Sequence, residues 1–345
     1  MNKIKRTTTY DISQRSGYSV ATVSRVLNGS TYPVKAETRE NIQKIAKEMH
    51  YVPNSFGKIL KTQQNRDIGI IVPNLSNSYY PTLLQGIYDY TLSAGYNPIL
   101  YNSYRRPELE EKNIQLLMQK QAQGFIIASI NPDSSIIQNA VNYGYRIVTI
   151  EQDIPVQCTK ILFNFKAGAY KATQCLLDHG HRAIGFIGAP LNRTSRIEML
   201  KGYQECLENA GLEIRSDYIR LGNREEDQEE IYEFENGIRM AKCFAKMKDR
   251  PTGYVCLNDM TALGAIKGFA ASGLQVPQDV SVIGFDNIPF AKMSTPELTT
   301  VDQCIYGMGT MAAQFLIDNI QDPAKPQVSI TLEPTIILRN SVRSL

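Results

Sequence analysis

The sequence lacks the motifs that mark most enzymes and membrane proteins. It has no HExxH, no GxSxG, no GxxxxGKS, and no GxGxxG after its first predicted strand, so it carries none of the common metallopeptidase, serine-hydrolase or nucleotide-binding patterns. No apolar run approaches the roughly 18 residues of a membrane span, and Met1-Asn2-Lys3 is not followed by an apolar signal core. We therefore expect a cytoplasmic protein without catalytic activity.

Histidine and cysteine are few, and their spacing does not suit metal chemistry. No cysteine or acidic residue has ligand spacing to the three histidines, and His179 and His181 flank Gly180, which favours a helix C-terminal cap instead. The six cysteines form no CxxC pair, and several lie in apolar runs, as in a protein whose thiols stay reduced. We expect no metal ion and no other cofactor.

Positive charge is concentrated near the N-terminus. Residues 1–66 contain twelve Lys or Arg and four acidic residues, a net charge of +8, whereas the whole chain carries +3, so the remaining residues carry −5. This distribution is expected when only the N-terminal part contacts the phosphates of a nucleic acid.

The basic segment has the pattern of a helix-turn-helix. Residues 10–16 form a short predicted helix, Gly17 supplies the turn, Ser19 caps the next helix, and residues 20–27 form that helix. Val23, Val26 and Leu27 share one face, which leaves the opposite face and the N-terminal end for the DNA major groove. A plain helical hairpin would show the same pattern, but the charge favours DNA binding. A third helix at 36–50 closes the small core, although Lys35 is a poor cap, a loss of about 1 kcal/mol.

A long string in this segment resembles the head of the LacI-type (lactose/galactose repressor) bacterial transcription regulators. The matching residues are Asp11-Ile12, Gly17-x-Ser19-x-x-Thr22-Val23-Ser24-Arg25-Val26-Leu27-Asn28, Thr38-Arg39-Glu40 and Tyr51-x-Pro53-Asn54. The resemblance implies an all-α head at 1–53 whose Val20 and Ala21 read base pairs. The head residues expected to contact DNA are Thr9, Tyr10, Ser19, Val20, Ala21, Thr22, Ser24, Arg25 and Asn28.

Residues 54–65 are expected to form a hinge. Phe56, Ile59 and Leu60 recur at helical spacing over barely two turns, and a helix this short is marginal in water, so a plain linker is the alternative. The resemblance implies a helix that forms only on DNA beside its twin from a second subunit, with Leu60 inserted between base steps. The hinge residues expected to contact DNA are Asn54, Phe56, Gly57, Lys58 and Leu60.

The remaining residues, 66–345, alternate between strand and helix patterns and predict two lobes with doubly wound parallel sheets. The expected strands are 68–72, 99–100, 125–127, 147–150, 183–187, 254–257 and 280–283, and the expected helices are 80–94, 108–120, 134–143, 169–178, 197–210, 229–248 and 261–271. We expect a first lobe at about 66–163 and 297–328 and a second at about 164–296 and 329–345. The predicted fold class is α/β, with an all-α helix-turn-helix head and a two-lobed core like that of periplasmic binding proteins.

Polar residues collect where the predicted strands end. An Asn or Asp after a strand usually caps the next helix or makes a turn, but four such strand ends together predict a ligand site. The core also resembles that of the LacI type through Gly180-His181-Arg182, Asn258-Asp259-x-x-Ala262, Val280–Asp286 and Leu298–Gln303. The resemblance implies that Asn258 and Asp286 bind effector hydroxyls and that Tyr79 and Tyr80 stack on the ligand. The expected effector-binding residues are Asn74, Tyr79, Tyr80, Glu151, Arg196, Met199, Asn258 and Asp286.

These features predict a homodimeric DNA-binding regulator, a repressor of carbohydrate-utilisation genes, which binds a palindromic operator of double-stranded DNA and responds to a sugar between the lobes. Three alternatives stay open. The ligand could be a purine or another metabolite acting as corepressor, because Met199 stands where the family commonly has Arg. Control could come from a partner protein, although Tyr306-Gly307 lacks the acid expected there, or the head could be fused to an enzyme. The tail after Arg339 has no apolar heptads, so no tetramerising coiled coil is expected.

Overall fold

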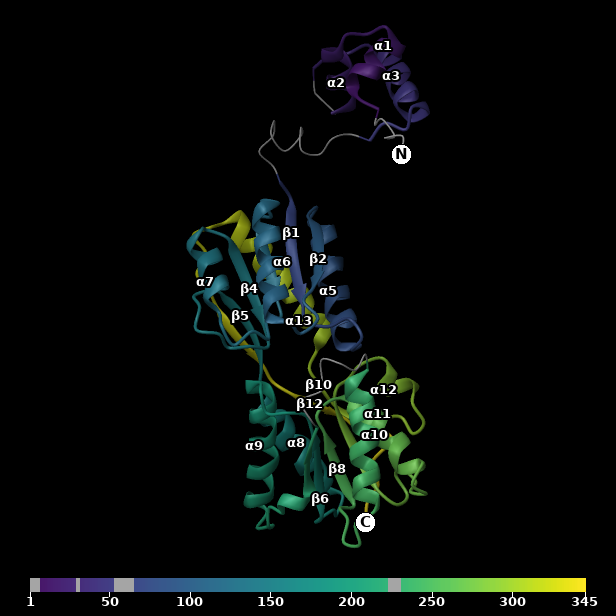
Figure 1. The fold of residues 1–345 in the computed structure, drawn as a ribbon, viewed down its shortest axis with the longest axis vertical. Helices are drawn as coiled ribbons and strands as arrows, with labels where there is room; N and C mark the ends of the chain where they lie inside the picture. The colour runs from purple at the N-terminus through teal and green to yellow at the C-terminus, as the bar shows by residue number, and fades with distance from the viewer. Residues whose placement is uncertain (1–6, 29–31, 53–64, 223–230) are drawn as a thin grey trace. The chain divides into compact units, whose positions relative to one another are not determined.

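The computed structural model describes residues 7–28, 32–52, 65–222 and 231–345. The chain divides into two compact units, residues 1–65 and residues 66–345, which we describe separately and call the head and the core. Figure 1 shows the helices of the head and the two sheets of the core.

The head consists of three helices, α1 (Thr9–Ser16), α2 (Val20–Leu27) and α3 (Ala36–Glu48). A reciprocal capping box between Thr8 and Asp11 starts α1, and Gly17 ends it with a left-handed backbone at φ 74°. Ser19 caps α2 as predicted, because its hydroxyl accepts from the Thr22 N–H at 3.2 Å. Lys35 makes no side-chain cap for α3, also as predicted.

A small apolar core holds these helices together. Its fully buried members are Ile12, Val23, Val26, Ile42 and Ala46, and Leu27 packs against them while partly buried. The predicted inward face of α2 is therefore confirmed. The opposite face of α2 stays accessible to solvent.

The first lobe contains a six-stranded sheet in which every pair of neighbouring strands is parallel. Its strands are, in spatial order, β11 (Ser329–Leu332), β5 (Thr159–Phe163), β4 (Arg146–Ile150), β3 (Gly124–Ile127), β1 (Asp67–Val72) and β2 (Asn97–Asn102). Helices α5 (Tyr79–Ser93) and α13 (Ile305–Gln321) pack on one face, and α6 (Pro107–Gln119) and α7 (Ser135–Asn142) on the other. The central strands are buried apolar runs, as parallel sheets covered on both faces require.

The second lobe repeats this plan. Its strands are, in spatial order, β12 (Thr335–Ile337), β10 (Thr299–Asp302), β9 (Ser281–Asp286), β8 (Gly253–Cys256), β6 (Ile184–Gly188) and β7 (Ile219–Leu221). The helices are α8 (Phe165–Asp178), α9 (Thr194–Asn209), α10 (Tyr232–Ala245), α11 (Asp259–Ala270) and the short α12 (Phe290–Met293), with a 3-10 turn at Ser216–Tyr218. Strand β12 is antiparallel to β10, which corrects the expectation of a purely parallel sheet.

The chain crosses between the lobes three times. The crossing after β5 lies where it was predicted, and the other two lie a few residues later than predicted. The predicted first-lobe segment 297–328 begins too early, because β10 still pairs with β9 in the second sheet, whereas α13 packs on the first lobe as predicted. The predicted second-lobe segment 329–345 also begins too early, because β11 pairs with β5 in the first sheet, whereas β12 joins the second sheet as predicted. In Figure 1 the yellow C-terminal segment accordingly appears in both lobes. Hydrogen bonding at the sheet edges decides these positions, and short edge strands leave little apolar pattern in the sequence.

Paired glycines let the covering helices approach closely. A Cβ on Gly309 of α13 would lie 2.1 Å from the Leu83 carbonyl oxygen of α5, and a Cβ on Gly86 of α5 would lie 2.1 Å from the Tyr306 oxygen of α13. Gly237 of α10 and Gly264 of α11 make the same kind of contact in the second lobe, with Cβ distances of 2.1 and 2.0 Å to backbone oxygens. These helix pairs therefore pack backbone against backbone.

The two histidines beside Gly180 have different roles. His179 is the C-cap residue of α8, as predicted, and Gly180 takes the left-handed backbone at φ 90°. His181, in contrast, is fully buried, with Nδ1 2.9 Å from the Thr252 hydroxyl, and Nε2 2.9 Å from the Ser281 hydroxyl and 3.2 Å from the Arg343 carbonyl. Because a carbonyl can only accept, Nε2 carries the proton of the neutral ring. Within the described residues, no group of His, Cys, Asp or Glu is arranged to hold a metal ion.

His181 should make the stability of the core depend on pH. Burial lowers the pKa of His181 in the folded state, so folding binds fewer protons and the stabilisation is lost as pH falls below about 6.5. We expect acidification from pH 7.5 to 5.5 to lower the melting temperature by roughly 2–4 °C more in the natural chain than in His181→Gln. Thermal unfolding monitored by circular dichroism measures this. His179→Gln is the matched control, and a dependence unchanged in His181→Gln would contradict the assignment.

Candidate functional site

A cleft between the lobes lies at the carboxyl ends of the parallel strands of both sheets. The cavity itself encloses about 80 Å³, and its mouth is open to solvent. Its lining is formed by Asn77, Tyr79, Tyr80, Arg105, Glu151, Phe165, Arg193, Ser195, Arg196, Met199, Glu233, Leu257, Asn258, Phe285, Asp286 and Gln303.

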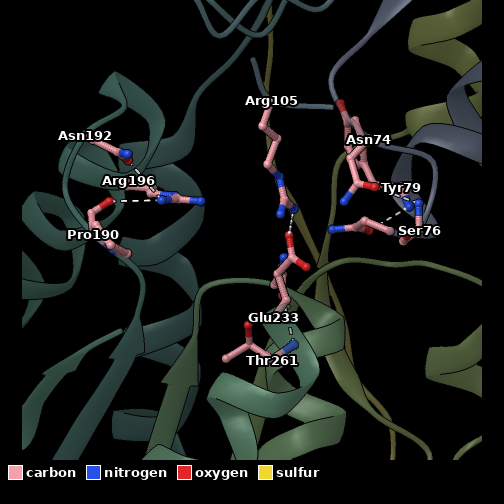
Figure 2. A network of polar contacts seen from close by, with 11 residues as sticks. Asn74, Ser76, Tyr79, Arg105, Pro190, Asn192, Arg196, Glu233 and Thr261 are labelled. Carbon is pink, nitrogen blue, oxygen red and sulfur yellow. Dashed lines mark hydrogen bonds and ion pairs between the residues drawn. The ribbon is translucent and has the colours of Figure 1, made fainter. Parts of the chain in front are cut away.

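The structure brings seven of the eight predicted effector-site residues together in this cleft. Three come from the first lobe and four from the second: Tyr79, Tyr80 and Glu151, and Arg196, Met199, Asn258 and Asp286. Asn74 is the exception, because its Oδ1 accepts from the Ser76 N–H at 2.7 Å in a local turn outside the lining (Figure 2). Asn77 lines the cleft in its place, and its Oδ1 accepts from the Tyr79 N–H at 2.9 Å. For Asn74 the turn interpretation was therefore the right one.

Two carboxyl groups face the cleft in an environment that disfavours their charge. Asp286 is 6% exposed, and the Gln303 amide donates to its Oδ1 at 2.6 Å. Burial, reinforced by the neighbouring Asp259 and Glu151, raises the pKa of Asp286 well above its ordinary value. Burial also raises the pKa of Glu151, against the opposing effects of the Tyr79 hydroxyl and Arg193.

Asp259 and Asn258 show how capping and lining roles combine. Asn258 caps α11, since its Oδ1 accepts from the Thr261 N–H at 2.8 Å, and it also lines the cleft. Asp259 is buried behind it and accepts from the Ile288 N–H at 2.8 Å and the Thr300 hydroxyl at 2.5 Å. Asp259 therefore fixes the strand ends around the cleft rather than lining it.

Aromatic rings form the apolar part of the lining. Tyr79 and Tyr80 meet edge to face with centroids 5.1 Å apart, and the Tyr79 hydroxyl donates weakly to Met308 Sδ at 3.5 Å. Phe165 and Phe285 lie nearly parallel, 6.1 Å apart, on the second lobe. The sequence did not predict these two phenylalanines as site residues. The signal for Phe285 was its place beside Asp286 at the end of a buried strand.

The lining also contains two arginines that were not among the expected effector-binding residues, Arg105 and Arg193. Arg105 forms an ion pair with Glu233 across the cleft (Figure 2). Arg193 and Ser195 also line the cleft. Arg196, which was predicted, donates to the Pro190 carbonyl and to Asn192 Oδ1, both at 3.0 Å. Arg105, Arg193 and Ser195 lie in loops or at a helix start, where periodicity gives no signal.

The arrangement is suited to holding a hydroxylated ring. Carboxylate and amide oxygens accept from vicinal hydroxyls, guanidinium and amide groups donate to them, and aromatic faces cover C–H surface. No histidine stands among the described lining residues next to Ser195, so the cleft lacks the hydroxyl–imidazole pair of a nucleophilic site.

The head presents its predicted DNA-contact residues around the start of α2. Val20 is 40% exposed and Tyr10 59%, and Ala21 and Arg25 are also exposed. The Arg25 guanidinium lies 4.2 Å from the centre of the Tyr32 ring. The remaining residues lie on the same two helices or directly beside them: Thr9, Ser19, Thr22, Ser24 and Asn28, whose amide donates to the Ser24 hydroxyl at 3.1 Å. The hinge residues Asn54, Phe56, Gly57, Lys58 and Leu60 lie outside the described residues.

Comparison with known proteins accounts for both units. Residues 8–54 match the bacterial regulatory proteins of the lacI family, and residues 173–342 match the periplasmic binding protein-like domain. The ribose operon repressor of Haemophilus influenzae is 30% identical over 338 residues, covering 97% of this chain and 98% of that protein. The chain belongs to the lacI family of bacterial regulators. It is a DNA-binding transcription regulator with the predicted fold class, which is thereby confirmed.

Two further relatives bear on the cleft. The transcriptional repressor PurR of Photobacterium profundum is 27% identical over 345 residues, covering 97% of this chain and 98% of that protein. A lacI-family regulator from Enterococcus faecium, solved with bound ribose, is 26% identical with a TM-score of 0.71, covering 81% of this chain and 99% of that one. In the described parts of this lacI-family chain, no helix is long and apolar enough to cross a membrane.

Proposed function

We propose that this regulator is a cytoplasmic homodimeric repressor whose affinity for a palindromic operator is lowered when a neutral sugar binds in the cleft. The observation that carries the proposal is the convergence of Asp286, Glu151 and Asn258 with the Tyr79–Tyr80 and Phe165–Phe285 rings. Ribose is the first candidate, because the Haemophilus influenzae relative is a ribose operon repressor and the Enterococcus faecium structure contains ribose.

The charges of the cleft favour a neutral ligand over an anionic one. Arg105 is paired with Glu233, and Arg193 interacts electrostatically with Glu151. Arg196 donates to a backbone carbonyl and a side-chain amide. The carboxyl groups of Asp286 and Glu151 also face the ligand space, and either one in its charged form would repel a phosphate or carboxylate. A polyhydroxy compound without charge meets none of this repulsion.

The second candidate is a purine base that acts as corepressor. The similarity to the Photobacterium profundum repressor PurR supports it, as does the apolar Met199 in the lining. The two candidates differ in the sign of their effect on DNA. The sugar weakens operator binding, whereas a corepressor strengthens it.

Thermal unfolding with a panel of compounds tests the proposal. A ligand at 100 times its Kd stabilises the folded state by about 2.7 kcal/mol, which is readily seen as a higher melting temperature. We expect D-ribose to raise the melting temperature, and we expect ribose 5-phosphate, a purine base and amino acids to leave it unchanged. Fluorescence anisotropy with an operator selected from random DNA, measured with and without the stabilising compound, then shows whether the compound lowers or raises operator affinity. If only the purine base raised the melting temperature, the effector would be a purine corepressor rather than a sugar. If no compound raised it, control by a partner protein would be favoured.

Leu60 should matter for specific DNA binding only. If its side chain enters between base steps at the centre of the operator, Leu60→Ala weakens operator binding by roughly 30- to 100-fold and binding to random DNA by less than about 3-fold. Lys58→Ala serves as the comparison, because loss of a phosphate contact weakens both by similar factors. Salt-controlled anisotropy titrations measure this. If Leu60→Ala weakened binding to operator and random DNA equally, Leu60 would not insert between base steps. This insertion is an expectation from the sequence alone.

A further inference from the structure

One ion pair spans the cleft from lobe to lobe. Arg105 lies in the turn between β2 and α6 of the first lobe, and its Nη2 contacts Oε1 of Glu233 on α10 of the second lobe (Figure 2). The two side chains are only 8% and 9% exposed. The Lys166–Glu205 pair, which joins two helices of the second lobe, has side chains 45% and 43% exposed. Arg105–Glu233 is therefore a desolvated charge pair shared between the lobes.

The Arg105 side of the pair is fixed by its turn. Tyr104 and Arg105 both have left-handed backbones, at φ 52° and 59°, which residues other than glycine seldom adopt. The Arg105 N–H donates to the Pro73 carbonyl at 2.9 Å, and the Tyr104 N–H donates to Asn102 Oδ1 at 2.9 Å. These bonds tie the turn to the ends of β1 and β2, so the guanidinium moves with the first lobe.

The Glu233 side is fixed by its helix. Glu233 is the second residue of α10, where the helix dipole favours a negative charge. Gly237 holds α10 backbone to backbone against α11, so this carboxylate moves with the second lobe. The two charges can meet only when the lobes are closed on each other.

We infer that the Arg105–Glu233 pair is an ionic clamp that holds the cleft closed. A buried ion pair gains Coulomb energy but loses the hydration of both ions, and the two terms nearly cancel. Such a pair adds little to the stability of the closed cleft. However, each charge offsets the free-energy cost of burying the other when the lobes close. The pair therefore favours closure modestly, which suits a cleft that must open and close reversibly.

The clamp makes a specific prediction for the loss of one partner. Without Glu233 the Arg105 charge would stay buried in the closed cleft without its partner carboxylate, which is strongly unfavourable. Opening the lobes returns that charge to water. Glu233→Gln should therefore shift the population of the core toward the open form, independently of which effector the cleft binds.

Double electron–electron resonance between two spin labels, one on each lobe, measures the distance between the lobes in the full chain without ligand. One label is attached to native Cys243, exposed on α10, and the other to a cysteine introduced by Gln115→Cys, exposed on α6, with Cys304→Ser removing the other exposed thiol. We expect Glu233→Gln and Arg105→Gln each to increase the ratio of open to closed molecules at least ten-fold. The double charge swap Arg105→Glu with Glu233→Arg should restore the closed distribution. Glu205→Gln, which breaks the pair within the second lobe, is the matched control and should change nothing.

Either of two results would overturn the clamp. One is a distance distribution in Glu233→Gln and Arg105→Gln that matches the parent chain. The other is a shift toward longer distances that the charge swap fails to reverse, because the two residues would then act separately. Since no ligand is present in this experiment, its failure leaves the proposed sugar response untouched. Failure of the sugar to stabilise the chain would likewise leave the clamp in place.

Discussion

Asp286→Ala should abolish the response to the effector while leaving DNA binding intact. Asp286 lies in the cleft with its carboxyl group held by Gln303 and has no part in the head. Its loss removes acceptors for sugar hydroxyls and leaves the Gln303 amide without its partner. Leaving a buried hydrogen-bonding group without its partner costs about 1–3 kcal/mol, and Asp286 offers two oxygens, so we expect at least a 100-fold loss in affinity for D-ribose. Isothermal titration calorimetry measures the affinity, and operator titrations with and without ribose measure the response.

The backbone at Asp286 requires a second variant. Its φ of 117° is unfavourable for alanine, so Asp286→Ala also introduces strain, whereas Asp286→Asn keeps the shape and an acceptor for Gln303. Both variants should lose the ribose response. Asp302→Asn is the matched control, because Asp302 is the register partner of Asp286 on β10 but stands outside the cleft lining. A full response in both Asp286 variants would make Asp286 a turn residue only.

Gly309→Ala should strongly destabilise the first lobe, as should Gly86→Ala on the facing helix. The new Cβ of Gly309→Ala would lie 2.1 Å from the Leu83 carbonyl oxygen and 3.1 Å from the Ile87 nitrogen, so α13 and α5 must move apart. Overpacking of this kind typically costs about 1–3 kcal/mol, and backbone atoms cannot rotate away as a side chain would. We expect a loss at the upper end of that range, measured by urea unfolding of the full chain.

Gly307→Ala provides a control in the same helix, two residues away. Its Cβ would meet only the end of the Cys304 side chain, which can rotate. Alanine is also a better helix former than glycine by about 1 kcal/mol, so this variant should be neutral or slightly stabilising. Equal effects of the two substitutions would show that helix propensity, rather than the α5–α13 contact, determines stability here.

The sequence predicted the elements with strong local signals. Helix α2 has the predicted bounds because a serine cap, an apolar face and a glycine turn all agree, and β1 was visible as a run of buried aliphatic residues. Strands β10, β11 and β12 were not predicted, because each is only three or four residues long and stands at or near a sheet edge. Strand β11 pairs with β5, more than a hundred residues earlier in the chain, and β12 lies directly after a crossing between the lobes. Neither feature leaves a periodic pattern in the sequence.

The site was predictable where the ligand-facing residues follow strands. Asp286 and Asn258 follow buried strands directly, and parallel topology brings such ends together. Arg105 and Glu233 carry no such signal, since one lies in an unusual left-handed turn and the other begins a helix that the sequence placed at 229–248. Asn74 was predicted as a site residue but does not line the cleft. It follows β1 as expected, but its side chain closes a local turn.

The three crossings between the lobes also constrain how this protein is made. Neither lobe is a continuous piece of chain: the first sheet lacks its last strand until residue 332 has been synthesised, and the second until residue 337. During synthesis, the surface of α5 around Gly86 stays uncovered until α13, more than two hundred residues later, has been made. The lobes are thus expected to finish folding together and late, so that shielding of the nascent core by chaperones would matter more here than for a regulator with sequential domains.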